Sequence, residues 1–531
     1  MTFVMNYDGN LWPVPLTKDT WISLLSAKLP GADPAFRGAR ATKFEKGWYT
    51  TMIKRIISLA SCVLLAASIV GMSGCSKEEG ETSTGGASTG GTESTASTPE
   101  KEVVDLDGYT FTWATLWEWW NYPEAGKSDY GDARTALYDE VQSKYNCKIE
   151  KVALAPDTFL DQINTAVMSG DKFADFIEVD YQRYQTLNRS KSLMALNTIE
   201  GFDVNQEKFF KSHTDAYTKD DNVYGVQYQY SQRAYGSFLF YNKTLLANEG
   251  LEDPYDLVKA DNWNFTKFQE ICKALTTSKS GGEIDQWGVA AVDWHANNFE
   301  KPMLFANGAA MIRENSEGRL SFGLLDTNAQ NALNYLHELE YVDGAMVPSD
   351  KDMVGTFNAA QCGFFSGSPD HFEALNANFK EGYEWSIVPL PKGPDAEDYN
   401  LMSVSFNSWV MLKNNTADAK KAAIVFDAIS EPLFGTVEED EAAYFEGLLY
   451  NTFGGDERTV EMLKLCAEKA VADRSWGMTG GDQIGAAIYA CVRDTEYTSQ
   501  AAMESIAGVI NGYIDGFFYG PDVDVNGNPI E

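Results

Sequence analysis

The sequence has few histidines and few basic residues, and both shortages exclude classes of function. Only 4 His occur in 531 residues, so histidine-based catalysis or a His-rich metal site has little material. Lys and Arg number 42 against 77 Asp and Glu, which gives a formal net charge of −35. Nucleic-acid binders need clustered cations to displace the counterions of the phosphates. We therefore expect no nucleic acid among the partners of this chain.

The signatures of several enzyme classes are also missing. The chain contains no Walker loop and no His-Glu-x-x-His motif. Its one Gly-x-Ser-x-Gly string, residues 86–90, stands in a Ser-, Thr- and Gly-rich stretch without the strand and helix that a nucleophile elbow needs. We therefore expect a protein that is not an enzyme and needs no cofactor. One enzymatic alternative stays open, a surface-anchored carbohydrate-active enzyme, because 77 acidic residues supply many carboxylate pairs of the kind that hydrolyse glycosides.

Cysteine is sparse, and none of the 7 cysteines stands in a Cys-x-x-Cys pair, which argues against a zinc ribbon or a thioredoxin-type motif. We expect five of them to be free and buried, with one disulfide as the alternative: Cys147, Cys272, Cys362, Cys466 and Cys491. The string Asp522–Gly527 resembles the opening of a calcium loop. An Asn-Gly hairpin turn explains it without a metal, so we expect no metal site.

One long apolar run is present. Met52–Arg55 is basic, the next sixteen residues are uncharged, and Met72-Ser73-Gly74-Cys75 follows. This order is typical of a secretory signal, and the run is too short for a mature spanning helix. Cysteine after Ser-Gly resembles the bacterial lipobox. We expect residues 52–74 to be a lipoprotein signal peptide and Cys75 to carry the lipid, palmitate included. The alternative is an apolar core helix that ends at a cysteine by chance.

We expect no folded structure in the segments on either side of this run. Residues 75–102 are the lipidated cysteine and a tether of Ser, Thr, Gly and Glu that cannot bury enough surface to order itself. Residues 1–51 precede a signal that normally starts a protein, so we expect a non-native or cleaved extension without a fold. A folded domain would then span 103–531, extracytoplasmic and anchored to the bacterial cell membrane by the lipid alone.

Short apolar strands alternate with amphipathic helices after residue 102, which is typical of α/β proteins with parallel sheets. We expect Thr158 and Thr266 to cap helices. The expected strands are Tyr109–Thr115, Lys148–Ala153, Phe173–Val179, Ser237–Tyr241, Trp287–Val292, Gln361–Phe365, Trp385–Pro389 and Val404–Leu412. The expected helices are Ala133–Tyr145, Thr158–Ser169, Asn264–Leu275, Asn328–Leu339, Ala417–Ala428, Asp456–Val471 and Ser499–Phe518.

Five passages occur in an order that a known family shares. They are Gly236–Leu246 with its Tyr-Asn-Lys, Trp263–Phe268, Phe357–Gly367, Trp385–Asp395 with its Pro-Leu-Pro-x-Gly-Pro, and Lys413–Asn415 with the Ala-rich helix behind it. Over about residues 105–430 the chain resembles the extracellular solute-binding proteins of family 1, relatives of the maltose-binding protein that serve ABC sugar importers. Cys362 and the aromatic cluster after the first strand depart from the pattern of that family.

The resemblance implies an α/β fold of the two-lobed periplasmic-binding-protein kind, with an interlobe hinge and a ligand cleft. By analogy lobe 1 is about 103–228 and 363–405, and lobe 2 is about 229–362 and 406–531. The implied hinge segments are Gln227–Tyr230, Gly363–Phe365 and Val404–Asn407.

The implied function is that of the substrate-binding lipoprotein of an ABC importer. Such a protein captures an oligosaccharide or a similar polyhydroxylated solute between its lobes and delivers it to the permease subunits. We expect a monomer. A cell-wall adhesion or scaffold lipoprotein is a further alternative, which would predict a flat surface without a hinge.

Sugar sites combine aromatic platforms with a few polar side chains, in loops beyond the carboxyl ends of strands. The candidates are Trp117, Glu118, Trp119, Trp120, Asp180, Tyr181, Tyr228, Tyr230, Trp294, Ser366, Asp370, His371, Asn407, Trp409 and Trp476. Structural roles are the alternatives for some of them. Asp180 and Ser366 would be helix caps, and Tyr228 and Tyr230 would pack at the hinge.

Overall fold

The computed structural model describes most of the chain after residue 103 and two short strands before it. The described residues are 2–5, 11–14, 104–116, 125–126, 129–154, 158–278, 281–292, 296–403, 405–415, 417–494 and 497–520. The predicted signal peptide, Cys75 and the tether lie outside them. So do Asp522–Gly527 and the candidates Trp117, Glu118, Trp119, Trp120 and Trp294.

The chain forms two compact units, Met1–Pro99 and Glu100–Glu531. In the first unit β1 (Thr2–Met5) and β2 (Leu11–Val14) pair antiparallel, although we expected no fold there. Among the described residues, no helix has the length and apolar character that crossing a membrane requires. All that follows concerns the second unit.

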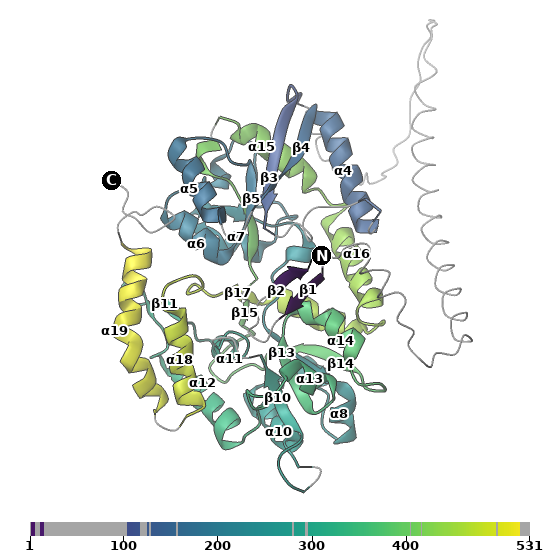
Figure 1. Ribbon diagram of the computed structural model, residues 1–531, viewed down its shortest axis with the longest axis vertical. Coiled ribbons are helices and arrows are strands. Elements are labelled where there is room, and N and C mark those ends of the chain that lie inside the picture. The colour runs from purple at the N-terminus through teal and green to yellow at the C-terminus, as the bar shows by residue number, and fades with distance from the viewer. Residues whose placement is uncertain are drawn as a thin grey trace, which may run out of the picture. The chain divides into compact units, whose positions relative to one another are not determined.

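A five-stranded sheet organises one half of the second unit, lobe 1, drawn above the other half in Figure 1. In order across the sheet the strands are β4 (Cys147–Ala153), β3 (Tyr109–Thr115), β5 (Phe176–Asp180), β16 (Asn407–Val410) and β8 (Gly225–Val226). β3 runs parallel to β4 and β5, whereas β16 runs antiparallel to β5 and β8. The helices of this lobe are α4 (Asp129–Tyr145), α5 (Phe159–Ser169), α6 (Tyr181–Arg189), α7 (Lys211–Ala216) and α15 (Ala419–Ile429).

A four-stranded sheet organises lobe 2. Its order is β10 (Trp287–Ala291), β13 (Cys362–Gly367), β9 (Phe238–Asn242) and β14 (Trp385–Pro389). β10 and β13 are parallel, and β9 is antiparallel to both of its neighbours. The main helices are α8 (Lys243–Asn248), α9 (Pro254–Lys259), α10 (Phe265–Leu275), α11 (Glu300–Ala306), α12 (Thr327–His337), α13 (Met353–Asn358), α14 (Phe372–Asn378) and α17 (Glu457–Glu468).

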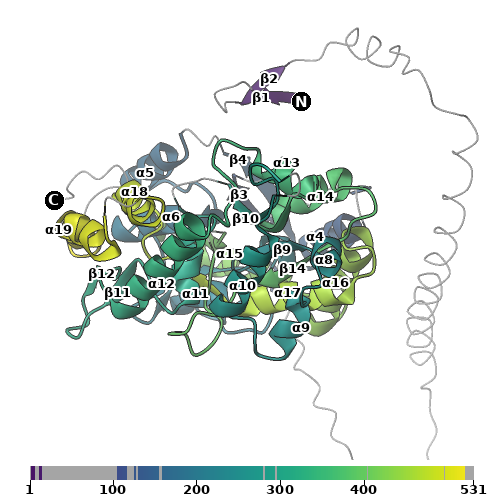
Figure 2. The same ribbon diagram turned by 90° about the horizontal axis from the view of Figure 1, so that it is seen from below.

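A helical pair closes one end of lobe 2. α18 (Gly481–Val492) packs on α19 (Ser499–Phe518), and α19 covers the hairpin of β11 (Ile312–Glu314) and β12 (Leu320–Phe322). Figure 2 shows these elements together at the end of the lobe opposite α8.

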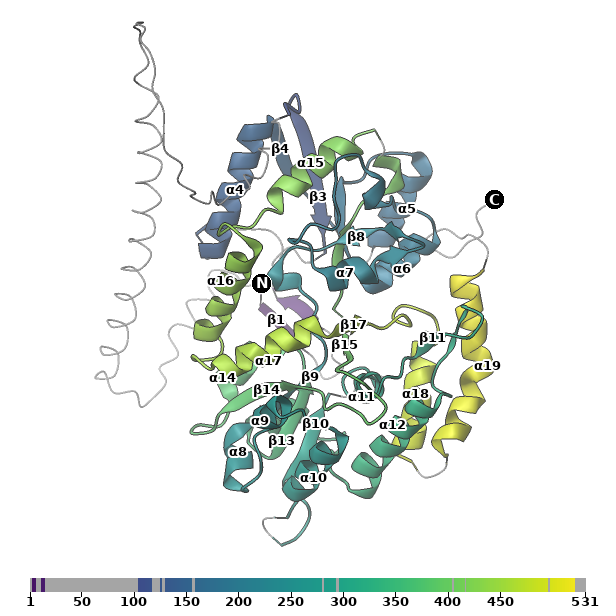
Figure 3. The same cartoon turned by 180° about the vertical axis from the view of Figure 1, so that it is seen from behind.

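The chain passes between the lobes three times. The first passage is 227–237, between β8 and β9. The second lies between β15 (Leu401–Ser403) and β16, and the third connects α15 to α16 (Val437–Asn451). β15 pairs in parallel with β17 (Ala470–Ala472), and Figure 3 shows this pair between the two main sheets.

The strand pairings correct the expected division into lobes. Residues 363–405 belong to lobe 2, because β13 and β14 both pair with β9. Residues 407–429 belong to lobe 1, because β16 pairs with β5 and α15 packs on α4. Gly363–Phe365 is therefore not a hinge. It lies inside β13, a buried strand with a neighbour on each edge.

Local sequence accounts for many elements. β3, β14 and α19 have the expected bounds. The cap of α10 is Asn264, whose side chain accepts a hydrogen bond from the backbone N–H of Lys267, so the expectation for Thr266 is wrong. Thr158 stands at the cap of α5 but accepts no backbone hydrogen bond there. The expected helix Asp456–Val471 ends at Glu468, because the next residues form β17.

Each lobe has an apolar interior. In lobe 1 the rings of Phe176 and Phe426 stack with centroids 4.0 Å apart, which joins the sheet to α15. In lobe 2 a single buried cluster extends from β9 through the helices to Ile514 in α19. The prediction of five free, buried cysteines is confirmed. Burying apolar surface of this kind is the main force that stabilises both lobes.

Candidate functional site

A cavity of about 850 Å³ lies where the interlobe segments meet lobe 2. Its walls are formed by residues from the segment that leads into β9 (231, 233 and 235–238) and from the segment around the second passage (402, 403, 405 and 407). The loops after β10 and β13, α14 and the C-terminal half of α16 also line it. The loops after β10 and β13 follow the carboxyl ends of two parallel strands, the place where α/β proteins bind ligands. This cavity is the candidate site.

Four of the predicted site residues line this cavity. They are Ser366, Asp370, His371 and Asn407. Ser366, Asp370 and His371 come from the end of β13 and the turn after it, and Asn407 begins β16. Sequence reasoning thus placed one wall of the cavity, formed by the β13 loop.

The Ser366 hydroxyl fixes the neighbouring wall. It donates a hydrogen bond to the backbone carbonyl of Asn298, and the Asn298 side-chain amide donates to the carbonyl of Val292 at 2.8 Å. Ser366 is not the cap of the following helical turn. That role belongs to Ser368, which forms a capping box with His371. The wall is therefore held by hydrogen bonds on both sides.

Asp370 and His371 differ in how firmly they are held. The His371 ring lies edge-on to Phe365, with centroids 5.0 Å apart. Asp370 is exposed, and its carboxylate accepts only a long hydrogen bond, 3.4 Å, from the Ser368 hydroxyl. Within the described part of the chain no ion pair involves Asp370. Its oxygens can therefore accept hydrogen bonds from the hydroxyls of a solute.

A further wall comes from α16, which contributes the aromatic ring of Tyr444 and the amide of Asn451. The ring of Tyr444 stacks on that of Tyr230 with centroids 5.5 Å apart, and the Tyr230 hydroxyl donates to the Val437 carbonyl. Arg233 also reaches α16, through an ion pair of 2.5 Å with Glu441. Tyr230 thus packs against a lining residue. The sequence analysis missed α16, whose stretch of acidic residues hides the apolar face.

Three other candidates meet at a second contact between the lobes. Asp180 caps α6 by accepting from the Arg183 backbone N–H at 2.8 Å, the alternative considered for it. Burial raises the pKa of Tyr181 to about 12. Trp476 packs against the same apolar cluster as Tyr181. Gln185 of α6 donates to the Arg474 carbonyl at 3.3 Å, so this loop touches lobe 1 outside the cavity.

Trp409 and Tyr228 are core residues of lobe 1. The Trp409 side chain has no exposed surface, and its ring lies 4.9 Å from that of Trp113 between centroids. Tyr228 is 4% exposed, with the Arg134 guanidinium over its ring. Neither residue lines the cavity. For Tyr228 this is the hinge-packing alternative. For Trp409 the available sign of burial was the apolar pattern that flanks it.

Two buried polar residues secure the interlobe segments, and sequence reasoning missed both. Glu178 accepts from the Thr115 hydroxyl at 2.7 Å and from the Gln227 amide at 3.0 Å. Burial raises its pKa to about 8. His213 is fully buried, and burial lowers its pKa to about 3. An acid between Ile177 and Val179, in the middle of a short apolar strand, was the available signal for Glu178.

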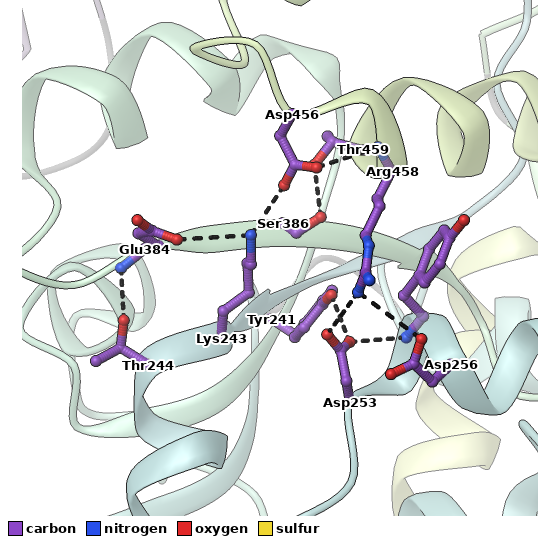
Figure 4. A network of polar contacts seen from close by, with 11 residues as sticks. Tyr241, Lys243, Thr244, Asp253, Asp256, Glu384, Ser386, Asp456, Arg458 and Thr459 are labelled. Atoms are coloured by element: carbon purple, nitrogen blue, oxygen red, sulfur yellow. Dashed lines mark hydrogen bonds and ion pairs between the residues drawn. The ribbon is translucent and has the colours of Figure 1, made fainter.

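A second polar network lies away from the cavity and is structural. Figure 4 shows Lys243 pairing with Asp456 at 3.0 Å, while Asp253 contacts Arg458 and the Tyr241 hydroxyl. These contacts anchor the start of α17 to β9 and to the helices that follow β9. Within the described ranges no group of three or more His, Cys, Asp or Glu is arranged to hold a metal.

Comparison with known proteins gives a family and a fold. The family described as bacterial extracellular solute-binding protein matches residues 104–428. No curated protein matches the sequence. Among solved structures, the cyclic alpha-maltosyl-1,6-maltose binding protein from Arthrobacter globiformis is similar with a TM-score of 0.57 and 15% identity, covering 77% of this chain and 100% of its own.

Two further structures show the same fold. A cyclo/maltodextrin-binding protein complexed with maltotetraose has a TM-score of 0.54 and 16% identity, covering 77% of this chain and 97% of its own. UgpB from Mycobacterium tuberculosis, in complex with glycerophosphocholine, has a TM-score of 0.53 and 16% identity, covering 77% of this chain and 98% of its own.

Proposed function

Because the chain belongs to the family of bacterial extracellular solute-binding proteins, we propose that it is the solute-binding component of an ABC importer. Its solute is an oligosaccharide or a similar polyhydroxylated molecule, held between the lobes. The bound solute shifts an equilibrium between open and closed arrangements of the lobes, and the closed form presents it to the permease subunits.

One observation carries this proposal, namely the position and composition of the cavity. It lies at the interlobe segments, so a molecule inside it touches the residues that must move when the lobes rotate. About 850 Å³ is within the range of small-molecule sites. Aromatic rings, hydroxyls, amides and two carboxylates, those of Asp370 and Glu373, line it, which is a combination that binds sugars. Two of the similar structures are named for glucose oligomers.

We assign ligand contact to the side chains that face this cavity. From the sequence prediction these are Ser366, Asp370, His371 and Asn407, and the structure adds Asn297 and Tyr444. Trp117, Glu118, Trp119, Trp120 and Trp294 complete the proposal as aromatic platforms and a polar neighbour in the loops after two strands. Asp180, Tyr181 and Trp476 belong to the second interlobe contact, where they would sense closure.

The remaining parts of the proposal concern location. Residues 52–74 direct export, Cys75 carries the lipid, and residues 76–102 hold the domain above the membrane as a monomer. The importer's permease and ATPase are then separate chains.

Thermal unfolding of residues 103–531 against neutral oligosaccharides, polyols, peptides and uronates tests the function. A solute that binds only the folded state adds about 2.7 kcal/mol at a hundredfold excess over its Kd. Stabilisation by one sugar class, with the sugar recovered intact, supports the proposal. Stabilisation with the sugar cleaved favours the carbohydrate-active enzyme, and no stabilisation by any sugar contradicts the solute class.

A further inference from the structure

Lys301 is a buried lysine directly behind the cavity wall. It lies in the first turn of α11, and only 3% of it is exposed. Its Nζ donates a hydrogen bond of 2.9 Å to Oδ1 of Asn297, and Asn297 lines the cavity. A buried ammonium is costly unless its partners compensate for lost hydration, so its position calls for a reason.

The contact fixes which way the Asn297 amide points. An ammonium group can only donate, so the Asn297 oxygen must face Lys301 and the amide nitrogen must face away from it. Within the described part of the chain, no residue accepts a hydrogen bond from this nitrogen. Because Asn297 lines the cavity, its two N–H groups are the ones available to a bound molecule.

The backbone around Asn297 is held as firmly as its side chain. Ala296 has φ of 62°, in the left-handed region that non-glycine residues rarely adopt. Its N–H donates to the Tyr489 hydroxyl at 2.6 Å, and its carbonyl accepts from the Lys301 N–H at 2.9 Å. A conformation of this kind persists only where its surroundings enforce it, and such positions concentrate at binding sites.

Acidic groups from three elements act on the charge of Lys301. Asp473 after β17, Asp482 in α18 and the adjacent Glu300 favour the protonated amine, whereas burial opposes it and lowers the pKa of Lys301 below its ordinary value. Asp473 is itself buried and accepts from the Ser475 hydroxyl at 2.7 Å. The ammonium thus has acidic groups near it that do not line the cavity.

We propose that Lys301 is a positioning residue that holds Asn297 as a hydrogen-bond donor toward an acceptor oxygen of the bound solute. This inference rests on the proposed function. It specifies the chemistry of the solute at this wall: a hydroxyl or ring oxygen that accepts, rather than an ammonium or amide N–H that donates.

The first test needs no solute. In the full chain labelled with ¹⁵N-asparagine, the Asn297 side-chain resonance is identified by its loss in Asn297→Asp. We expect this resonance to titrate with a midpoint below pH 10.5, as Lys301 loses its proton, and to stop titrating in Lys301→Met. If the resonance behaves the same in wild type and Lys301→Met, Lys301 does not orient Asn297.

The second test measures binding of maltotetraose and of mannotriose by calorimetry. Lys301→Met is expected to weaken binding of whichever sugar the wild type binds by about three- to tenfold, the value of one hydrogen bond. The matched control is Lys208→Met, which removes a buried lysine paired with Asp427 and Glu431 in lobe 1 and is expected to change affinity less than twofold.

The outcomes separate the inference from the function. Affinity unchanged in Lys301→Met but lowered in Asn297→Asp overturns the role of Lys301 while the function stands. Equal losses in Lys301→Met and Lys208→Met mean a general loss of stability and also overturn it. If the wild type binds neither sugar, these two sugars are not its solutes, and the resonance experiment alone decides whether Lys301 orients Asn297.

Discussion

The Nε2 atom of His213 accepts a hydrogen bond of 2.9 Å from the backbone N–H of Ala234. His213 belongs to α7 in lobe 1, and Ala234 lies in the first segment that passes to lobe 2. The other ring nitrogen is 3.3 Å from the Ser408 hydroxyl, beside the second segment. Only an unprotonated Nε2 can accept, so a neutral imidazole connects α7 to the first segment and to β16, which follows the second segment.

Because His213 is buried in its neutral form, we expect the protein to lose stability as the pH falls. Its pKa is about 3 in the folded protein and 6.5 when unfolded, so its contribution is present above pH 6.5 and is lost as the pH falls toward 3. Between pH 7 and pH 5 we expect this group to lower the free energy of unfolding by about 2 kcal/mol. Urea unfolding of wild type and His213→Gln at both pH values checks this. Equal pH dependence in the two proteins would contradict it.

For Glu178 we expect the opposite pH dependence, a free energy of unfolding that falls as the pH rises. Its pKa is about 8 when folded and 4.5 when unfolded, so its contribution is present below pH 4.5 and is lost as the pH rises through 8. Wild type should lose about 2 kcal/mol more than Glu178→Gln between pH 5.5 and pH 7.5. Urea unfolding of both proteins measures the difference. The account of Glu178 as a buried neutral acid would be wrong if the difference were absent.

Asp370 predicts a loss of affinity without a loss of stability. A carboxylate accepts stronger hydrogen bonds from sugar hydroxyls than an amide does, so Asp370→Asn should weaken solute binding about tenfold or more. Its exposure implies an unchanged unfolding temperature. The control is Asp350→Asn, an exposed carboxylate of the same lobe outside the cavity. Similar affinities for the two variants would remove Asp370 from the site.

Because Asn264 caps α10, we expect its substitution to lower stability and the substitution of nearby Thr266 to have little effect. Asn264→Ala removes the hydrogen bond to the Lys267 N–H and should cost about 1 kcal/mol. Thr266→Ala, two residues along, should cost much less. Chemical denaturation of the two variants decides between them, and the reverse order would restore the capping assignment made from the sequence.

From the proposed lipid on Cys75 we predict that the protein is found in the membrane fraction of the cell. If this cysteine carries the lipid, Cys75→Ser expressed in a bacterium should lose palmitate labelling and move from the membrane fraction to the soluble one. Cys62→Ser in the apolar run is the control and should leave labelling intact. Labelling that survives Cys75→Ser would refute the anchor.

The local pattern of apolar residues predicted helices and strands well where that pattern alone determines the secondary structure. The strands β3 and β14 and the helix α19 follow from apolar spacing alone. The division into lobes does not, because it depends on pairing between distant strands. Phe365 in β13 pairs with Phe240 in β9, and nothing near either residue encodes the other. Analogy with a family then assigned β13 and β14 to the wrong lobe.

The lining of the cavity could be predicted in part, for a similar reason. Ser366, Asp370 and His371 follow a recognisable strand, so their position at its carboxyl end could be inferred. The role of Lys301 behind Asn297 could not be inferred. In the sequence Lys301 is a charged residue next to Glu300 at the start of a helix, a pattern typical of an exposed surface. Trp409 shows the opposite error. An aromatic residue next to an interlobe segment is a reasonable candidate for stacking on a sugar. The Trp409 ring packs instead against Trp113 in the core of lobe 1.

The distance between the lobes tests the central claim most directly. Spin labels on Glu140→Cys in α4 and Ala377→Cys in α14 sit on exposed positions of different lobes. Residues 103–531 contain five native cysteines, all of them buried, so labelling of this part of the chain is selective. A sugar that raises the unfolding temperature should shift the distance distribution toward one shorter, narrower population. A stabilising sugar that leaves the distribution unchanged would contradict capture between the lobes.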